Sequence, residues 1–162
     1  MIIDIGNKKI KINKDVLTEI YKRRQLNIED CEVGGMLIGS IIKYSYDIVI
    51  EDLTTPMEGD FCSRTRYIRS ENHNKLLEKK WIDSQYTKMY FGEWHTHHQD
   101  NPYYSFQDLT NWKKLMKKSE TSTDLLVFLI AGISSFKIWI GDRTKITIRQ
   151  IYEGDYSGFK MD

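Results

Sequence analysis

The chain has 162 residues, 40% of them apolar and 29% charged, a balance that suits one globular domain with a single core. Its 24 Lys and Arg nearly cancel its 23 Asp and Glu, and a net charge of +1 argues against a nucleic-acid or membrane-surface binder. The longest apolar run, residues 125–133, is far shorter than the roughly 20 residues of a membrane helix. With no signal-peptide pattern and no disulfide framework, we expect a cytoplasmic protein.

The first part of the chain predicts short strands around a helix. Residues 2–12 favour one or two strands, and Asn13 can cap a helix that runs to about Arg24. Residues 35–42 and 46–53 are apolar and rich in β-branched side chains, so they predict a β-hairpin.

The middle of the chain starts with a polar, irregular stretch, residues 54–69, which we expect to be a long loop. Long loops in compact domains are often functional, and this one is a candidate substrate-facing flap. A second helix is expected over residues 71–84, with Trp81 facing inward. His73 is expected on the surface of that helix and is assigned no role.

The last part predicts a strand over residues 88–97, a loop, and a third helix that starts at Ser105. Three more strands follow, at residues 125–131, 136–140 and 145–152. Strands and helices alternate without a regular βαβ rhythm. The pattern therefore predicts an α+β domain spanning residues 1–162, with a mixed, mainly antiparallel sheet and about three helices. The tail, residues 153–162, has little apolar content and is expected to be loosely ordered.

The stretch of residues 93–108 carries the clearest chemical signal. His95 and His97 are two apart in an extended strand, so both side chains point to one face about 6.6 Å apart. A loop then leads to Ser105 and Asp108, which are three residues apart at a helix start. Two imidazoles and one carboxylate form a known catalytic zinc set that leaves one position for water.

Each part of this pattern also has a purely structural explanation. Alternating histidines occur on ordinary exposed strands, and a Ser-x-x-Asp sequence is typical of a capping box at a helix start. His98 follows His97 directly and should point away, so we exclude it from the site.

A possible proton acceptor precedes the first long apolar strand. Glu32 stands before Gly34 and Gly35, and glycines allow another backbone or a ligand to approach closely. A phosphate-binding loop is not supported, because strand-like residues and not a helix follow Gly39. Taken alone, Glu32 is an ordinary acid before a turn.

Taken together, these residues resemble the JAMM/MPN metalloproteases, whose pattern is Glu, Gly-Gly-x-Leu-x-Gly, His-x-His, seven residues and Ser-x-x-Asp. The matching residues, in the family's order, are Glu32, Gly34, Gly35, Leu37, Gly39, His95, His97, Ser105 and Asp108. The resemblance implies a layered, cytidine-deaminase-like MPN/JAB fold. It also implies Zn²⁺ held by His95, His97 and Asp108, with Glu32 as general base and Ser105 as hydrogen-bond donor to the oxyanion.

Residues 90–97, Tyr-Phe-Gly-Glu-Trp-His-Thr-His, are similar to the prokaryotic JAB proteins of antiviral-defence and mobile-element operons. Trp112 and residues 60–69 resemble the same group. Those proteins are encoded with ubiquitin-like activating and conjugating enzymes and act as deconjugases. One departure is His98, at a position where the family usually has proline.

The resemblance implies a zinc-dependent isopeptidase or peptidase that acts after an extended C-terminal tail. Its substrate is then a ubiquitin-like modifier or conjugated protein attached to a target, or a modifier whose C-terminus is processed. Two alternatives stay open: an inactive MPN scaffold module, and a JAB hydrolase acting on a sulfur-carrier protein.

Overall fold

The computed structural model describes residues 1–45 and 47–159. The helices are α1 (Lys14–Lys22), α2 (Asn72–Asp83) and α3 (Phe106–Lys118), with a 3-10 turn η1 (Ser157–Phe159) near the end. The strands are β1 (Ile2–Asp4), β2 (Lys9–Ile12), β3 (Gly34–Ile41), β4 (Ile48–Leu53), β5 (Phe61–Ser63), β6 (Arg66–Ile68), β7 (Met89–Thr96), β8 (Leu125–Ala131), β9 (Ser135–Asp142) and β10 (Thr147–Asp155). Every segment predicted as a strand or helix contains one, although residue 46, at the start of one predicted strand, lies outside the described residues.

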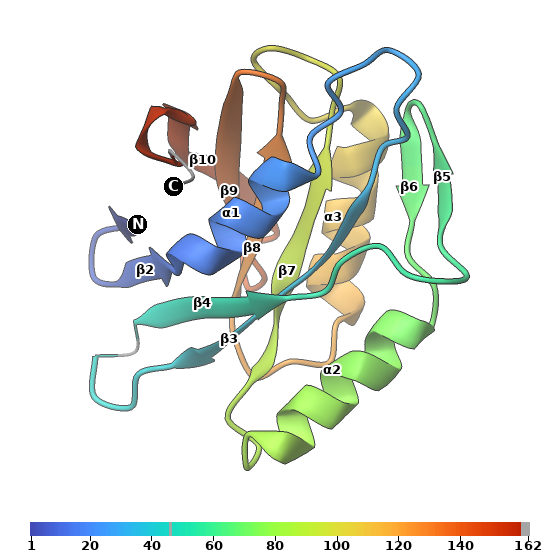
Figure 1. Ribbon diagram of the computed structural model, residues 1–162. Coiled ribbons are helices and arrows are strands. Elements are labelled where there is room, and N and C mark those ends of the chain that lie inside the picture. Colours follow the sequence, from blue (N-terminus) through green and yellow to red (C-terminus); the bar gives the residue numbers. More distant parts are fainter. Residues whose placement is uncertain (46, 160–162) are drawn as a thin grey trace.

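An eight-stranded sheet forms the centre of the molecule, in the order β1-β2-β4-β3-β7-β8-β9-β10 (Figure 1). The pairs β2–β4 and β7–β8 are parallel, and the other neighbouring pairs in this sheet are antiparallel. The predicted α+β class with a mixed, mainly antiparallel sheet and three helices is therefore confirmed. Within the described ranges, none of the helices is long and apolar enough to span a membrane.

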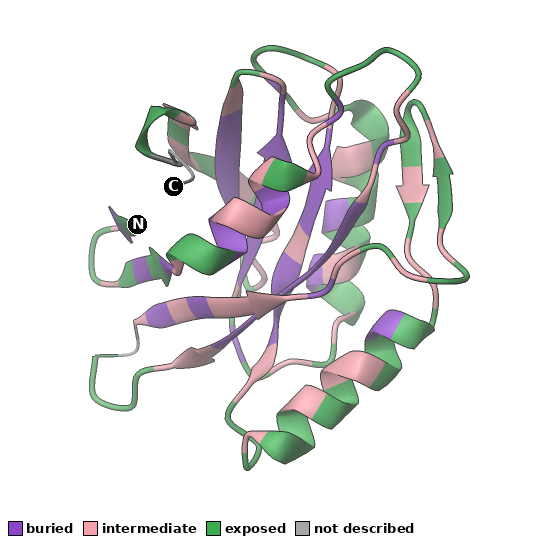
Figure 2. Ribbon diagram, viewed as in Figure 1, coloured by how far each residue is buried: buried purple, intermediate pink, exposed green. Residues whose placement is uncertain are grey.

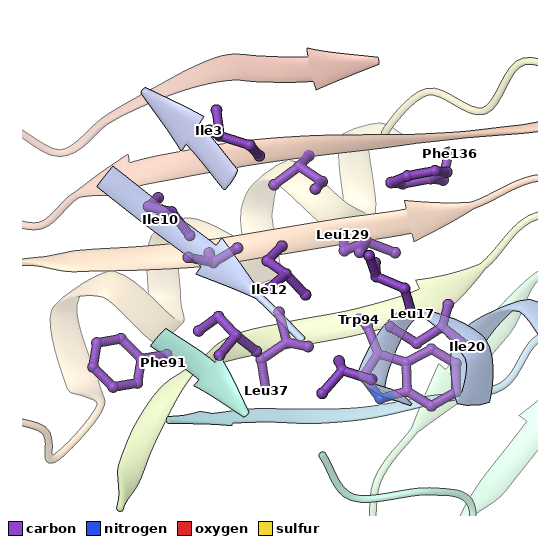
Figure 3. Packing of buried hydrophobic residues seen from close by; sticks show 14 of the residues in the cluster. Ile3, Ile10, Ile12, Leu17, Ile20, Leu37, Phe91, Trp94, Leu129 and Phe136 are labelled. Carbon is purple, nitrogen blue, oxygen red and sulfur yellow. The ribbon is translucent and has the colours of Figure 1, made fainter. Parts of the chain in front are cut away.

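Apolar side chains pack on both faces of the sheet, which Figure 2 shows as the most buried part of the molecule. On one face, Leu17 and Ile20 of α1 join a cluster with side chains from the central strands (Figure 3). On the other face, Trp112 and Met116 of α3 are buried, and the Trp112 ring stacks on Phe128 at 4.6 Å. α3 is thus anchored through its middle and second half, and its N-terminal turn, with Asp108, lies beside His95 and His97 at the end of β7.

A β-bulge in β7 sets the direction of the side chains that follow it. Phe91 and Trp94 are three residues apart, yet both lie in the cluster beneath α1. Regular alternation would place residues two apart on the same face. Tyr90 pairs with Ile38 and Gly92 pairs with Leu37, so Phe91 between them is the extra residue of the bulge. Gly92 has φ +133°, and a Cβ there would lie 1.9 Å from the Val127 carbonyl oxygen. The bulge therefore requires glycine, and it turns His95 toward α3.

Residues 54–69 differ from the continuous loop that was predicted. β5 and β6 pair as a separate antiparallel hairpin, so the loop prediction was wrong over residues 61–68. The strands are only three residues long, and their mostly exposed side chains mix apolar and polar types without the alternation that marks a longer strand. Contacts with residues far away in the sequence hold this hairpin in place, and local sequence patterns cannot predict such contacts.

The prediction for His73 was also wrong, because this side chain is fully buried and not on the surface of α2. Its Nδ1 lies 2.6 Å from Thr54 Oγ1, and its Nε2 lies 3.0 Å from Asp60 Oδ2 and 3.2 Å from the Tyr67 hydroxyl. Trp81, predicted to face inward, is instead 43% exposed. Helical periodicity alone cannot show the polar partners that satisfy a buried imidazole.

Asp60 makes a pH-dependent contribution to the free energy of unfolding that can be measured. Burial opposes its ionisation, but hydrogen bonds from His73 and from the amides of Met57 and Ser70 outweigh this and lower the pKa of Asp60. A carboxylate whose pKa is lower in the folded than in the unfolded state stabilises the fold at pH values above the unfolded-state pKa of about 3.9. This stabilisation is lost as the pH falls toward the folded-state pKa. We expect Asp60→Asn to cost about 2 kcal/mol at pH 7. In urea titrations, the difference from wild type should shrink below about pH 4; a difference independent of pH would contradict this assignment.

The described part of the chain ends with β10 and η1. Residues 153–155, counted from the sequence as part of a loosely ordered tail, extend β10 and pair with residues 135–137 of β9. Residues 160–162 of that predicted tail lie outside the described residues.

Candidate metal and catalytic site

Four side chains from separate segments converge at one end of the sheet. Glu32 lies in the loop before β3, His95 in β7, His97 just after it, and Asp108 in the first turn of α3. One nitrogen or oxygen atom from each lies within 4.8 Å of the corresponding atoms of the others. The structure thus brings together all four residues that the sequence suggested as metal ligands and base.

The spacing of the two imidazoles and the carboxylate fits a tetrahedral metal ion. His95 Nε2 and His97 Nε2 are 3.1 Å apart, and they lie 3.3 Å and 3.4 Å from the two Asp108 carboxylate oxygens. An ion with bonds of about 2.0–2.2 Å in tetrahedral geometry separates its ligand atoms by roughly 3.3–3.6 Å. The donor set and its distances are therefore those of a metal site.

Ser105 holds the Asp108 carboxylate in place at the start of α3. The Ser105 hydroxyl and backbone amide donate to Asp108 Oδ2, at 2.8 Å and 2.6 Å, and the Asp108 amide donates back to Ser105 Oγ at 3.1 Å. The capping box suggested by the sequence is therefore present. It serves the helix and orients a candidate ligand at the same time.

Burial and neighbouring charges shift the acid–base properties of the cluster. Burial raises the pKa of Glu32, and the nearby imidazoles of His95 and His97 oppose this only in part. For Asp108, burial acts against ionisation, but the hydrogen bonds with the two imidazoles outweigh it and hold the pKa well below its usual range. The cluster therefore combines one carboxylate whose pKa is lowered, Asp108, with a second whose pKa is raised, Glu32.

Two cavities meet at the cluster, and Glu32 and Ser105 line both of them. One, of about 280 Å³, reaches toward His98 and Ile28. The other, of about 490 Å³, is a groove between β6 and α3, with Glu93 from β7 along it. Figure 1 shows the β5–β6 hairpin standing beside α3. An extended chain lying in this groove would lead directly to the cluster.

Comparison with known proteins identifies the family. The family model described as prokaryotic homologs of the JAB domain matches residues 13–146. The chain belongs to this family. The JAB family predicted from the sequence motifs is confirmed.

Two relatives of this JAB protein carry the name CD-NTase/cGAS isopeptidase. The protein from Pseudomonas aeruginosa is 32% identical over 124 residues, which cover 75% of this chain and 76% of that protein. The protein from Vibrio cholerae is 32% identical over 136 residues, which cover 82% of each chain. A solution structure of a protein from Desulfitobacterium hafniense shares the fold, with a TM-score of 0.57 and 16% identity over 87% of this chain and 88% of that one.

Two residues of the JAB site were not predicted from the sequence. Thr96, between the two histidines, accepts a hydrogen bond from the Val33 amide at 3.0 Å and so ties the Glu32 loop to β7. Gln99 Oε1 lies 3.3 Å from His97 Nδ1, an acceptor that leaves Nε2 of this imidazole free to bind a metal. Strand alternation gives a signal for Thr96, because the residue between two ligands points to the opposite face. Gln99 follows the strand, where no periodicity applies.

His98, which was excluded from the site, lies apart from the JAB cluster. Its Nδ1 donates to the Gln25 carbonyl oxygen at 3.0 Å. The loop that follows is tied to the sheet end, where the Ile133 amide donates to the Gln99 carbonyl oxygen at 2.7 Å. The imidazole at this position thus connects two loops beside the site.

Proposed function

We propose that this protein is a cytoplasmic zinc isopeptidase that releases a conjugated CD-NTase or cGAS-like enzyme from its target in a bacterial antiviral-defence system. The observation that carries the proposal is the cluster of Glu32, His95, His97 and Asp108 at the end of an open groove. Membership of the JAB family and relatives named CD-NTase/cGAS isopeptidase over three quarters or more of the chain support the substrate class. Operon-encoded activating and conjugating enzymes are the expected partners.

We assign the metal to His95, His97 and Asp108, and zinc is the ion that this nitrogen-and-oxygen set favours. Held by these residues, zinc would supply Lewis acidity, which would make water a stronger nucleophile near neutral pH and polarise the scissile carbonyl. Gln99 keeps His97 Nε2 available, and Ser105 holds the Asp108 carboxylate. In this proposal the protein fixes the three ligands in place and leaves one side of the metal site open to the groove.

Glu32 is the proposed general base and acid. Glu32 is 6% exposed, and burial raises its pKa, which brings proton acceptance closer to neutral pH. It takes a proton from the attacking water and passes it to the amine of the cleaved bond. Ser105 is the proposed donor to the developing oxyanion. Its hydroxyl donates to Asp108 Oδ2 in this structure, so this role requires rotation of the side chain.

The groove between β6 and α3 is the proposed site for the extended tail that precedes the scissile bond. Among the described residues β6 pairs only with β5, and an extended segment can pair with the other edge of β6 by strand addition. The groove fits any conjugate with an unfolded tail, so a ubiquitin-like modifier is the second candidate substrate. The relatives' names favour the CD-NTase.

The proposal is tested with a CD-NTase joined through its C-terminus to a reporter protein. Zinc-loaded protein should cleave at the junction, and treatment with a chelator should abolish cleavage until zinc is restored. A zinc-loaded protein that cleaves neither this fusion nor a ubiquitin-like one would favour the inactive scaffold. Cleavage of a sulfur-carrier fusion alone would favour the other alternative.

Zinc should also stabilise the fold in a way that depends on the ligands. Binding to the folded state alone adds about 2.7 kcal/mol when free zinc is roughly 100 times Kd. Wild type should therefore show a clear rise in Tm on addition of zinc, and His97→Ala should lose that rise. His98→Ala is the matched control, because His98 lies next in the sequence but bonds to Gln25 outside the cluster. An equal zinc effect in His97→Ala and wild type would contradict the ligand assignment.

A further inference from the structure

A buried polar network is one of the attachments of the β5–β6 hairpin to the rest of the molecule, beside the hydrogen bond that the Glu32 amide donates to the Ser63 carbonyl oxygen at 2.8 Å. Asp60, just before β5, accepts hydrogen bonds from the amides of Met57 and Ser70 and from the Tyr67 hydroxyl on β6, at 2.9, 2.7 and 2.8 Å. This carboxylate therefore fastens both ends of the hairpin to each other. Its side chain is only 7% exposed.

His73 links this network to the central sheet. The imidazole lies between Asp60 and Thr54, and Thr54 Oγ1 also accepts the Met36 amide of β3 at 2.7 Å. The Thr54 carbonyl oxygen accepts the Trp94 indole N–H at 3.0 Å, on the strand that carries His95. The chain of contacts thus runs from the metal-bearing strand to the hairpin.

The order Thr54–His73–Asp60 resembles a nucleophilic triad, but its burial excludes that chemistry. Thr54 is 1% exposed and His73 is 0% exposed, so no substrate reaches the hydroxyl. His73 and Asp60 line neither cavity beside the site. Buried polar groups that satisfy each other fully make one geometry rigid, and that is the function this arrangement can serve.

The rigid element is one wall of the groove. Tyr67 lines the groove with its neighbours on β6, and a Cβ at Gly34 would lie 2.9 Å from its ring. Gly34 pairs with His95 across β3 and β7. Tyr67 therefore lies between the network and the strand pair that carries the catalytic cluster.

We propose that Thr54, His73 and Asp60 are positioning residues that hold β6 at a fixed distance from α3 and so set the affinity of the groove for the substrate tail. This inference rests on the proposed function. Because the network does not touch the reacting atoms, its loss should weaken tail binding and leave the chemical step intact. Loss of the network should also increase local opening of the hairpin.

The test compares Thr54→Val with Thr54→Ser in the full-length, zinc-loaded protein. Valine keeps the shape but removes the hydroxyl, whereas serine retains it. Valine removes the contacts of Thr54 Oγ1 with His73 Nδ1 and with the Met36 amide. With the CD-NTase fusion as substrate, Thr54→Val should therefore raise KM roughly tenfold, with kcat within about twofold of wild type. Thr54→Ser should have the wild-type KM, and the zinc content should be equal in wild type, Thr54→Val and Thr54→Ser. Amide hydrogen exchange over residues 61–68 should be faster in Thr54→Val alone.

The outcomes separate this inference from the proposed function. Wild type that cleaves no conjugate contradicts the proposed function, and unchanged exchange over the hairpin in Thr54→Val contradicts the inference without any activity measurement. An unchanged KM, or a fall in kcat with loss of zinc, also overturns it. If Thr54→Val does not fold, Tyr67→Phe decides through exchange: it removes the hydroxyl that donates to Asp60, and exchange over residues 61–68 should become faster. KM is not the readout for this variant, because Tyr67 itself lines the groove.

Discussion

Replacement of Glu32 by glutamine should reduce cleavage of a CD-NTase fusion by about 10³-fold and leave the zinc content unchanged. Glutamine has nearly the same shape as glutamate but cannot accept a proton from water, and a positioned general base typically contributes 10²–10⁴-fold. Glu32 is buried beside the three proposed ligands, and we assign it the role of base and not of a fourth ligand. Its loss should therefore appear in kcat and not in zinc affinity, measured by a competitive chelator.

Asp108→Asn is the matched comparison for the Glu32→Gln variant. Asp108 is the carboxylate between the two imidazoles, so its amide variant should lose both zinc and activity. Retained activity in Glu32→Gln would remove Glu32 from the mechanism. Loss of zinc in both variants would mean that Glu32 acts as a ligand and not as a base.

The sequence predicted the candidate site better than its surroundings, because most site residues lie close together in the sequence and the surroundings depend on contacts between distant residues. His95 and His97 share a strand, and Ser105 and Asp108 share one helical turn, so local periodicity places each pair correctly. That Glu32 joins them depends on the β3–β7 pairing, which the family resemblance supplied. Periodicity alone contains no information on which strands become neighbours.

The errors arose where distant contacts decide the structure. His73 lies on a helix whose apolar stripe is weak, and its burial depends on Thr54 and Asp60, which come before it in the chain. The β5–β6 hairpin depends on the same contacts. The side chain that was assigned no role and the segment assigned to a loop are thus two parts of one structural unit, and neither could be predicted without the other.

The β7 bulge provides the second large expected effect, now on stability. Gly92→Ala places a Cβ 1.9 Å from the Val127 carbonyl oxygen at a φ of +133°, so the β7–β8 pair must separate or the bulge must move. We expect a loss of about 4 kcal/mol in the free energy of unfolding, since steric overlap and backbone strain act together. Any folded fraction should bind zinc weakly, because moving the bulge turns His95 away from Asp108.

Gly6→Ala separates the two causes. Gly6 has φ +103°, in the same left-handed half of conformational space, but a Cβ there meets nothing within 4 Å. Its replacement should cost only the backbone strain, about 1 kcal/mol, with zinc affinity unchanged. Urea unfolding of the two variants beside wild type measures the difference. Equal losses of unfolding free energy in the two variants would mean that the close approach of β7 to β8 is not the reason for glycine at position 92. That result would contradict the proposal that the bulge directs His95 toward the site.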